Sequence, residues 1–206
     1  MEDKILDSVN KYYSDKIKEH GISPKGVDWN SVESQELRFK ELSSFINFGN
    51  QFSILDFGCG YGALLPYING LTGNFSYTGF DISEEMIREA RANNTQNKNA
   101  AWTTQLSDIE QFDYSVASGI FNVRLEVGDN EWKKYIENTL VRINKHSTKG
   151  FSFNMLTSYS DKEYMRDYLY YADPAYFFDF CKRNFSKYIA LMHDYPLYEF
   201  TIIVKK

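Results

Sequence analysis

The sequence contains few of the residues that build disulfide frameworks or metal centres. Its 206 residues include 2 cysteines and 3 histidines. Cys59 lies in a glycine-rich segment and Cys181 lies far from it, so we expect no disulfide framework and a reducing, cytoplasmic setting. The histidines are too widely separated to offer the spacing of zinc ligands, and we expect no metal site.

Long apolar runs and basic clusters are missing as well. No stretch approaches the roughly 18 apolar residues of a membrane span, and Met1–Lys4 lacks a signal-peptide pattern, so we expect no membrane partner. The net charge is −5, and lysines and arginines occur only in scattered pairs. Because proteins that grip phosphate backbones need clustered positive charge, we do not expect a nucleic-acid substrate.

What the sequence does contain suits one globular domain. Hydrophobic residues make up 43% and charged residues 25%, which is ordinary, and the length suffices for one well-packed domain. We therefore expect a single domain over residues 1–206, with an N-terminal helical cap over 1–48 and an α/β core over 50–206. The aromatic content of 17% is high, and it fits either an aromatic core or a pocket for a flat, apolar substrate.

Strand and helix patterns alternate along the core. Apolar runs predict strands at 53–56, 74–81, 101–104, 114–121, 151–156, 188–192 and 197–204. Helical spacing predicts helices at 1–20, after Ser31, at 62–68, 83–93, 129–145 and 175–185. The last two strands are joined by a few residues only, so they must be antiparallel. The order predicts a doubly wound α/β fold, in which a mostly parallel seven-stranded sheet ends in an antiparallel hairpin. Residues 158–171 form either a lid or a helix.

A glycine turn follows the first strand of the core. Gly58, Gly60 and Gly62 lie directly after that strand, where backbone without side chains lets a ligand approach closely. Asp81 ends the next strand, at the distance at which a carboxylate accepts hydrogen bonds from both hydroxyls of a ribose. These residues together predict a nucleoside-binding crevice.

Two ligand classes fit such a crevice. Gly58, Gly60 and Ala63 satisfy a relaxed dinucleotide pattern, which keeps an NAD-dependent oxidoreductase as an alternative. Asp56, two residues before the first glycine, favours another ligand, because a carboxylate there repels a pyrophosphate and accepts hydrogen bonds from an ammonium group.

The segment Leu55–Gly62, with the sequence LDFGCGYG, resembles the first motif of class I S-adenosylmethionine-dependent methyltransferases. Gly79–Met86 resembles their second, acid-bearing motif. The resemblance implies S-adenosyl-L-methionine as cofactor and methyl transfer to a small molecule by in-line displacement. It implies that the backbone of the three glycines faces the methionine part and the ribose, and that Asp56 helps to hold the ammonium group. It also implies that Asp81 holds the ribose hydroxyls and that Ile82 packs on the adenine. A non-catalytic S-adenosylmethionine-binding protein remains a further alternative, because no general base is obvious.

Further candidates lie at the ends of the third and fourth strands, at the edge where ligands bind in open α/β sheets. Gln105 falls where the family often has a polar group for the adenine amino group; the alternative is a surface polar residue. Ser118 and Gly119 could contact the methionine part through their backbone. Asn122 could orient substrate or cofactor, or it could form an Asx turn.

Other candidates lie outside these motifs. Arg38 could bind the cofactor carboxylate or pair with a nearby glutamate, and it shares a helix face with Gln35. His193 is a general base by residue type, beside Asp194, or simply an exposed turn residue. We expect substrate contacts from four further residues: Trp29, Asn30, Asn154 and Tyr159.

Overall fold

The computed structural model describes residues 2–21, 23 and 31–206, and Trp29 and Asn30 lie outside these residues. The helices are α1 (Glu2–His20), α2 (Val32–Ser43), α3 (Leu64–Leu71), α4 (Glu84–Asn93), α5 (Asp129–His146) and α6 (Pro174–Asn184). The strands are β1 (Phe52–Phe57), β2 (Phe75–Phe80), β3 (Ala100–Thr103), β4 (Phe112–Ala117), β5 (Ser147–Leu156), β6 (Tyr188–Met192) and β7 (Glu199–Lys205).

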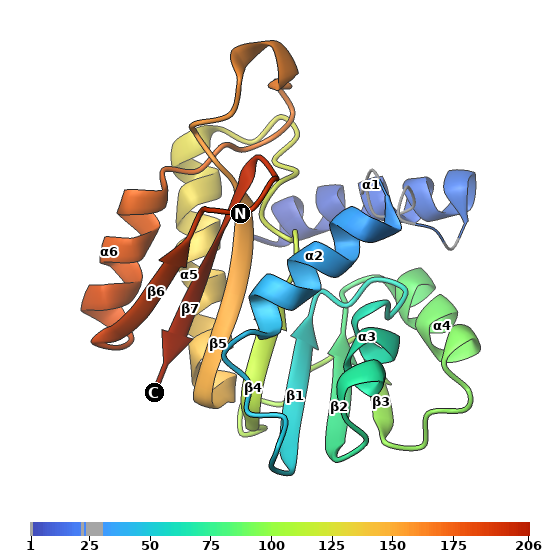
Figure 1. Cartoon of the computed structure of the whole chain (residues 1–206). Coiled ribbons are helices and arrows are strands. Elements are labelled where there is room, and N and C mark those ends of the chain that lie inside the picture. The colour runs from blue at the N-terminus through green and yellow to red at the C-terminus, as the bar shows by residue number, and fades with distance from the viewer. Residues whose placement is uncertain (1, 22, 24–30) are drawn as a thin grey trace.

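The strands form a single seven-stranded sheet in the order β3-β2-β1-β4-β5-β7-β6 (Figure 1). β1 to β5 are parallel, and β7 pairs antiparallel with both β5 and β6. The predicted fold class, a mostly parallel sheet that ends in an antiparallel hairpin, is therefore confirmed. The carboxyl ends of β1, β2 and β4 meet at one edge of the sheet, where ligands bind in open α/β folds.

The sheet is covered on both faces, which is why its central strands are almost continuously apolar. Alternate side chains of β1 enter different cores. Ile54 packs with residues of α2 and α3 on one face, and Leu55 packs with residues of α5 and α6 on the other. Both side chains are fully buried. Figure 1 shows α2 and α3 in front of the sheet and α5 behind it.

Polar caps begin three of the helices where the sequence predicts them. The Ser31 side chain accepts a hydrogen bond from the Ser34 N–H, and Ser34 reciprocates, which makes a capping box at the start of α2. Ser83 caps α4. Asp173 caps α6, with Pro174 in its first turn. These caps satisfy backbone N–H groups that have no partner within the helix.

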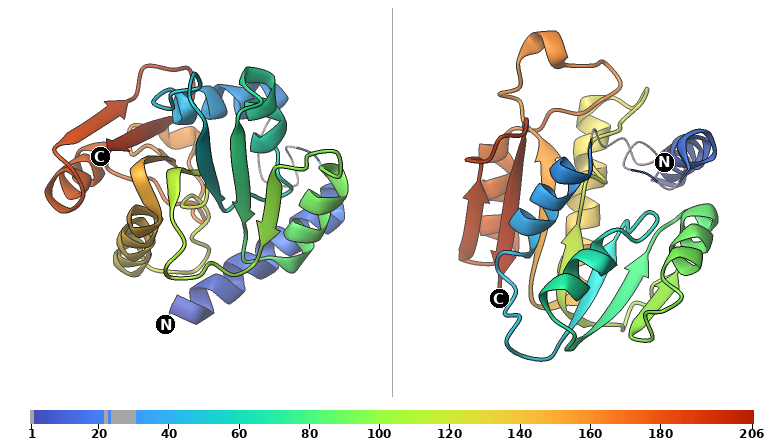
Figure 2. Two further views of the ribbon diagram at one scale, coloured as in Figure 1. Left: turned by 90° about the horizontal axis from the view of Figure 1, so that it is seen from below. Right: turned by 45° about the vertical axis from the view of Figure 1, so that its right-hand side comes forward.

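Helix α1 bridges two parts of the molecule. Near its start, Ile5 is buried in the same core as α5 and α6. Near its end, Lys18 forms a 3.3 Å ion pair with Glu85 of α4, and the Ser14 and Ser83 hydroxyl oxygens lie 3.2 Å apart. Figure 2 shows α1 running alongside α4 at one side of the sheet.

Two segments differ from the sequence-based predictions. The predicted strand 114–121 is wrong over its last four residues, because β4 ends at Ala117 and Gly119 has a φ of 73°. Residues 158–171 form mostly irregular structure with one short 3-10 turn at Lys162–Tyr164. Backbone hydrogen bonds hold this segment to the rest of the protein; for example, Ser158 N donates to Ala172 O at 2.9 Å. Among the described residues, no helix combines the length and apolarity that crossing a bilayer requires.

Trp132 offers a test of the core between α5 and the sheet. Its side chain is fully buried, and its Nε1–H donates to the Phe121 carbonyl at 2.9 Å. Trp132→Phe would leave that carbonyl without its partner and open a small cavity. We expect it to lower the free energy of unfolding by about 2–3 kcal/mol in chemical denaturation. Lys134→Ala, an exposed position on the same helix, should cost less than about 0.5 kcal/mol. Equal effects of the two substitutions would contradict this account.

Candidate functional site

The glycine turn after β1 is held against the end of β2 by backbone hydrogen bonds. Gly58 N and Cys59 N both donate to the carbonyl of Phe80, at 2.7 and 2.9 Å. Gly58, Gly60 and Gly62 have φ values of 81°, 54° and 85°, which residues with a Cβ rarely adopt. The turn therefore brings the ends of β1 and β2 together and leaves backbone facing outward between them.

Two of these glycines are also required by packing. A Cβ on Gly58 would lie 2.2 Å from Cγ2 of Ile120, in the loop after β4. A Cβ on Gly62 would lie 2.4 Å from Cη2 of Trp102. Gly58 thus keeps the turn close to the β4 loop. Gly62 makes room for the Trp102 ring, and it does not line the cavity described below.

Asp81 joins the turn to the start of α4. One carboxylate oxygen accepts from Gly60 N and the other from Ser83 N, both at 2.9 Å. Burial raises the pKa of Asp81, and these two backbone hydrogen bonds oppose that rise. A carboxylate offers about four lone-pair positions, so two remain for the hydroxyls of a ligand.

Asp56 lies at the base of the same region and is almost completely buried. The Tyr77 hydroxyl donates to its carboxylate at 2.5 Å. Burial raises the pKa of Asp56 to about 7; the Tyr77 hydrogen bond lowers it, and the nearby charge of Asp81 raises it further. The carboxyl group therefore changes charge near neutral pH, and a cation bound beside it would favour the ionised form.

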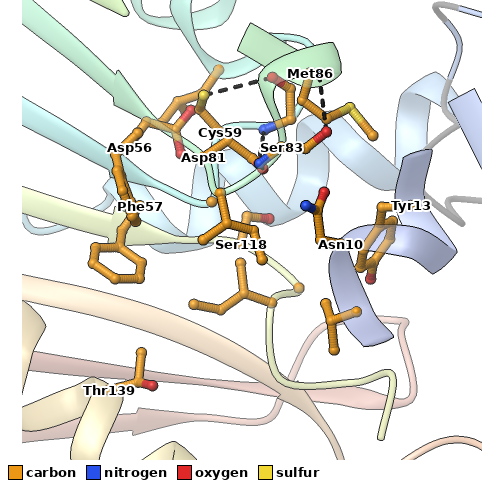
Figure 3. A pocket seen from close by; sticks show the side chains of 18 of the residues that line it. Asn10, Tyr13, Asp56, Phe57, Cys59, Asp81, Ser83, Met86, Ser118 and Thr139 are labelled. Atoms are coloured by element: carbon orange, nitrogen blue, oxygen red, sulfur yellow. Dashed lines mark hydrogen bonds between the residues drawn. The ribbon is translucent and has the colours of Figure 1, made fainter. Parts of the chain in front are cut away.

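The loop after β4 forms the third side of the site. Ser118, Gly119 and Ile120 all border the cavity. Ser118 Oγ is buried and has no hydrogen-bond partner among the described residues, which leaves a polar atom for a ligand to satisfy. Figure 3 shows the Ser118 side chain between the Asp56 and Asp81 region and α1.

These three sides enclose one end of a cavity of about 560 Å³. This volume lies within the ~300–1,000 Å³ typical of small-molecule sites. Predicted residues that reach the cavity are Asp56, Gly58, Gly60, Asp81, Ile82, Ser118 and Gly119.

Helices that the glycine motif does not include supply much of the remaining lining. From α1 come Leu6, Val9, Asn10 and Tyr13; α5 contributes Tyr135, Asn138, Thr139, Val141 and Arg142. Gln35 of α2 also lines the cavity, and its Oε1 accepts from the Tyr61 hydroxyl at 3.1 Å. The amphipathic pattern of α1 is visible in the sequence, but only its packing against α4 and the α5 core turns this face toward the cavity.

Arg38, Asn122 and Asn154 are buried outside the cavity. The Arg38 guanidinium forms an ion pair with Glu199 of β7. Of the two roles considered for Arg38, the structure therefore shows the pair with a glutamate. Asn122 Oδ1 accepts from Leu156 N at 3.1 Å, and Asn154 Oδ1 accepts from Gly119 N at 2.8 Å. The two asparagines therefore tie the β4 loop to β5.

Three further predicted residues are exposed and do not line the cavity. Gln105 makes backbone hydrogen bonds with the Thr103 hydroxyl. Tyr159 is 74% exposed, and its ring centroid lies 5.9 Å from that of His193. His193 directly follows β6, and β4, β5 and β7 lie between β6 and the strand that leads into the glycine turn. The structure therefore does not bring these residues together with Asp56 and Asp81.

The glycine turn can be tested with a matched pair of substitutions. Gly58→Ala forces a side chain into a left-handed conformation and against Ile120, so we expect it to lower the free energy of unfolding by about 2 kcal/mol or more. Gly73→Ala is the control, because a Cβ there meets nothing within 4 Å. Thermal and chemical denaturation measure both changes. If the two variants were equally stable, the packing role of Gly58 would be refuted.

Sequence comparisons relate this chain to known methyltransferases. Residues 54–145 match a family model described as "Methyltransferase domain". A Mycobacterium tuberculosis protein named "Putative methyltransferase Rv1506c" is 54% identical over 161 residues, which cover 78% of this chain and 97% of that protein.

Two solved structures share the fold at low sequence identity. Magnesium protoporphyrin IX methyltransferase from Synechocystis PCC 6803, with bound SAH, has a TM-score of 0.67 and 15% identity, and 98% of each chain is covered. N-methyltransferase NodS from Bradyrhizobium japonicum WM9, in complex with S-adenosyl-L-homocysteine, has a TM-score of 0.63 and 14% identity, with 96% of this chain and 97% of that chain covered. The 54% identity to the mycobacterial protein, with the domain match, shows that the chain belongs to the methyltransferases.

Proposed function

We propose that this protein transfers a methyl group from S-adenosylmethionine to a small-molecule acceptor by direct in-line displacement. The observation that carries the proposal is the convergence of Asp56, the glycine turn and Asp81 on one cavity, which α1 and α5 extend. Membership of the methyltransferases counts against the alternative of an NAD-dependent oxidoreductase.

The residues at the β1, β2 and β4 edge fit the methyl donor. The free lone pairs of Asp81 suit the ribose hydroxyls, and the side-chain-free turn at Gly58 and Gly60 suits the methionine part. Asp56 suits the ammonium group, directly or through a water molecule. Ile82 offers an apolar surface for the adenine, and Ser118 Oγ has an unused hydrogen-bonding position.

The donor supplies an activated methyl group, so the chain mainly binds, orients and desolvates the reactants. In the displacement, a lone pair of the acceptor forms the new bond to the methyl carbon, while the carbon–sulfur bond breaks and its electrons stay on sulfur. Asp56 and Asp81 place negative charge at the donor end of the cavity, which favours binding of a cationic donor.

The other end of the cavity suits the acceptor. Asn10 and Tyr13 of α1, Gln35 of α2, and Asn138 and Thr139 of α5 offer amide and hydroxyl groups among apolar side chains. Such a lining orients a small molecule through a few hydrogen bonds. We propose that α1 acts as a cap over this region, as expected for residues 1–48.

Two further observations support a small acceptor. The net charge of −5 disfavours a nucleic-acid partner. Among the proteins of similar fold is a phosphoethanolamine N-methyltransferase of Haemonchus contortus, described in complex with phosphoethanolamine and S-adenosylhomocysteine. We assign no proton transfer to His193, because its exposed ring lies outside the cavity.

Titration calorimetry tests donor binding. We expect S-adenosylmethionine and S-adenosylhomocysteine to bind the protein and NAD not to bind. Asp81→Asn should weaken both adenosyl ligands by about tenfold or more, because charge-assisted hydrogen bonds are lost. The control is Asp108→Asn, an exposed carboxylate paired only loosely with Lys145.

Two outcomes would refute parts of this proposal. Binding of NAD alone would overturn methyl transfer. Binding without turnover, in a screen of metabolite pools with a labelled methyl donor, would point to a non-catalytic S-adenosylmethionine-binding protein.

The raised pKa of Asp56 predicts a pH dependence of donor binding. The ionised carboxylate binds an ammonium group better than the neutral acid does, so affinity for S-adenosylhomocysteine should rise with pH up to about 7 and then level off. In Asp56→Asn this rise should be absent. Calorimetry between pH 5.5 and 8 (a range of roughly one to one and a half pH units on either side of this pKa) measures the effect.

The pH dependence of the free energy of unfolding gives an independent check of the raised pKa of Asp56. The folded pKa of about 7 lies above the ordinary aspartate value of 3.8, so the folded protein binds more protons than the unfolded chain between these two pH values. The contribution of Asp56 to stability is therefore full below the lower value and is lost as the pH rises toward the higher one. Asp56→Asn should remove this slope from urea denaturation. A slope that is unchanged in the variant would contradict the assignment.

A further inference from the structure

A buried chain of polar groups connects α2 to the loop that borders the donor end of the cavity. It begins at Arg38 of α2, whose Nε lies 2.9 Å from both carboxylate oxygens of Glu199 on β7. Arg38 is 7% exposed and Glu199 is 1% exposed. Both charged groups are removed from water. Replacing only one of them would leave the other buried without a partner, which is strongly destabilising.

Asn154 carries the chain onward to the loop. Its Nδ2 donates to Glu199 Oε2 at 2.5 Å, and its Oδ1 accepts from Gly119 N at 2.8 Å. The side chain is fully buried. Gly119 is flanked by Ser118, whose hydroxyl is free to meet a ligand, and by Ile120, which packs against Gly58.

Only one order of donors and acceptors is consistent along this series of hydrogen bonds. A guanidinium only donates, so the Glu199 carboxylate is the acceptor in its contact with Arg38. A carboxylate only accepts, so the Asn154 amide must direct its NH2 group toward Glu199. Its carbonyl oxygen is then left to accept from Gly119 N–H.

We propose that Glu199 is a positioning residue for methyl transfer: it orients the Asn154 amide, which holds Gly119 and so sets the position of the donor-binding loop 118–120. This inference rests on the proposed function. The other end of the loop is held independently, through Asn122 Oδ1 and Leu156 N. Loss of the Glu199 contact should therefore move the Gly119 end of the loop alone.

Glu199→Gln tests the order of donors and acceptors along these buried hydrogen bonds. To keep an acceptor toward Arg38, the new amide must present its NH2 group to Asn154. Asn154 must then turn its carbonyl oxygen toward position 199 and its NH2 group toward Gly119 N–H, where two donors face each other. We expect S-adenosylhomocysteine to bind about tenfold more weakly, and exchange of the Gly119 amide hydrogen to be faster by a similar factor.

The double variant Glu199→Gln with Asn154→Asp should restore function. The carboxylate introduced at position 154 accepts both from the new amide NH2 group at position 199 and from Gly119 N–H, so the acceptor facing the loop returns. We expect the affinity of the double variant for S-adenosylhomocysteine to recover to within roughly threefold of the unmodified protein. A role of Glu199 in stability alone does not predict recovery when a second residue of the chain is changed.

A matched control and a second single variant complete the experiment. Glu126→Gln makes the same chemical change at an exposed position and should leave binding unchanged. Asn154→Leu removes the link but keeps the Arg38–Glu199 pair, so it too should bind about tenfold more weakly. If Glu199→Gln does not fold, Asn154→Leu decides the question.

The outcomes separate this inference from the proposed function. If the unmodified protein does not bind S-adenosylhomocysteine, the proposed function fails. If it binds, and folded Glu199→Gln or Asn154→Leu binds equally well, the positioning role is overturned. Weaker binding by Glu199→Gln that the double variant does not relieve would also overturn it.

Discussion

The site depends on two backbone hydrogen bonds, from Gly58 and Cys59 to the carbonyl of Phe80. They hold the turn after β1 against the end of β2. Through this contact Gly60 reaches Asp81, and Asp81 in turn reaches the start of α4. This contact requires glycines in the left-handed conformation, because a side chain at Gly58 would collide with the neighbouring loop. The edge at which we propose that the methyl donor binds thus arises from the way parallel strands end.

Around this rigid edge, the protein arranges groups with different electrostatic properties. Asp56 and Asp81 are carboxylates in a poorly solvated region, and burial raises the pKa of both. Such a region favours a positively charged ligand, which restores the stability of the ionised carboxylates. Arg38 and Glu199 are also removed from water, but they neutralise each other away from the cavity. Their role is to support a loop and not to contact a ligand.

Much of this could be predicted from the sequence, because the signals are local. The glycines lie close to each other in the chain, Asp81 ends the following strand, and Ser31, Ser83 and Asp173 cap helices through neighbours a few residues away. Arg38 shows the limit of such reasoning. Its partner, Glu199, is 161 residues away in the chain, and the two meet because β7 pairs with β5 and α2 packs against both strands.

The sequence by itself determined the order of strands and helices, the fold class and the position of the glycine turn and Asp81 at one edge of the sheet, since each follows from periodicity or from a short motif. The tertiary structure alone decided which remaining polar residues face the cavity. It directs Asn10 and Tyr13 of α1 and Asn138 and Thr139 of α5 into the cavity, and it leaves His193 outside. The physical reason is that a side chain's surroundings depend on how distant elements pack. Residue type and spacing along one element do not encode that packing.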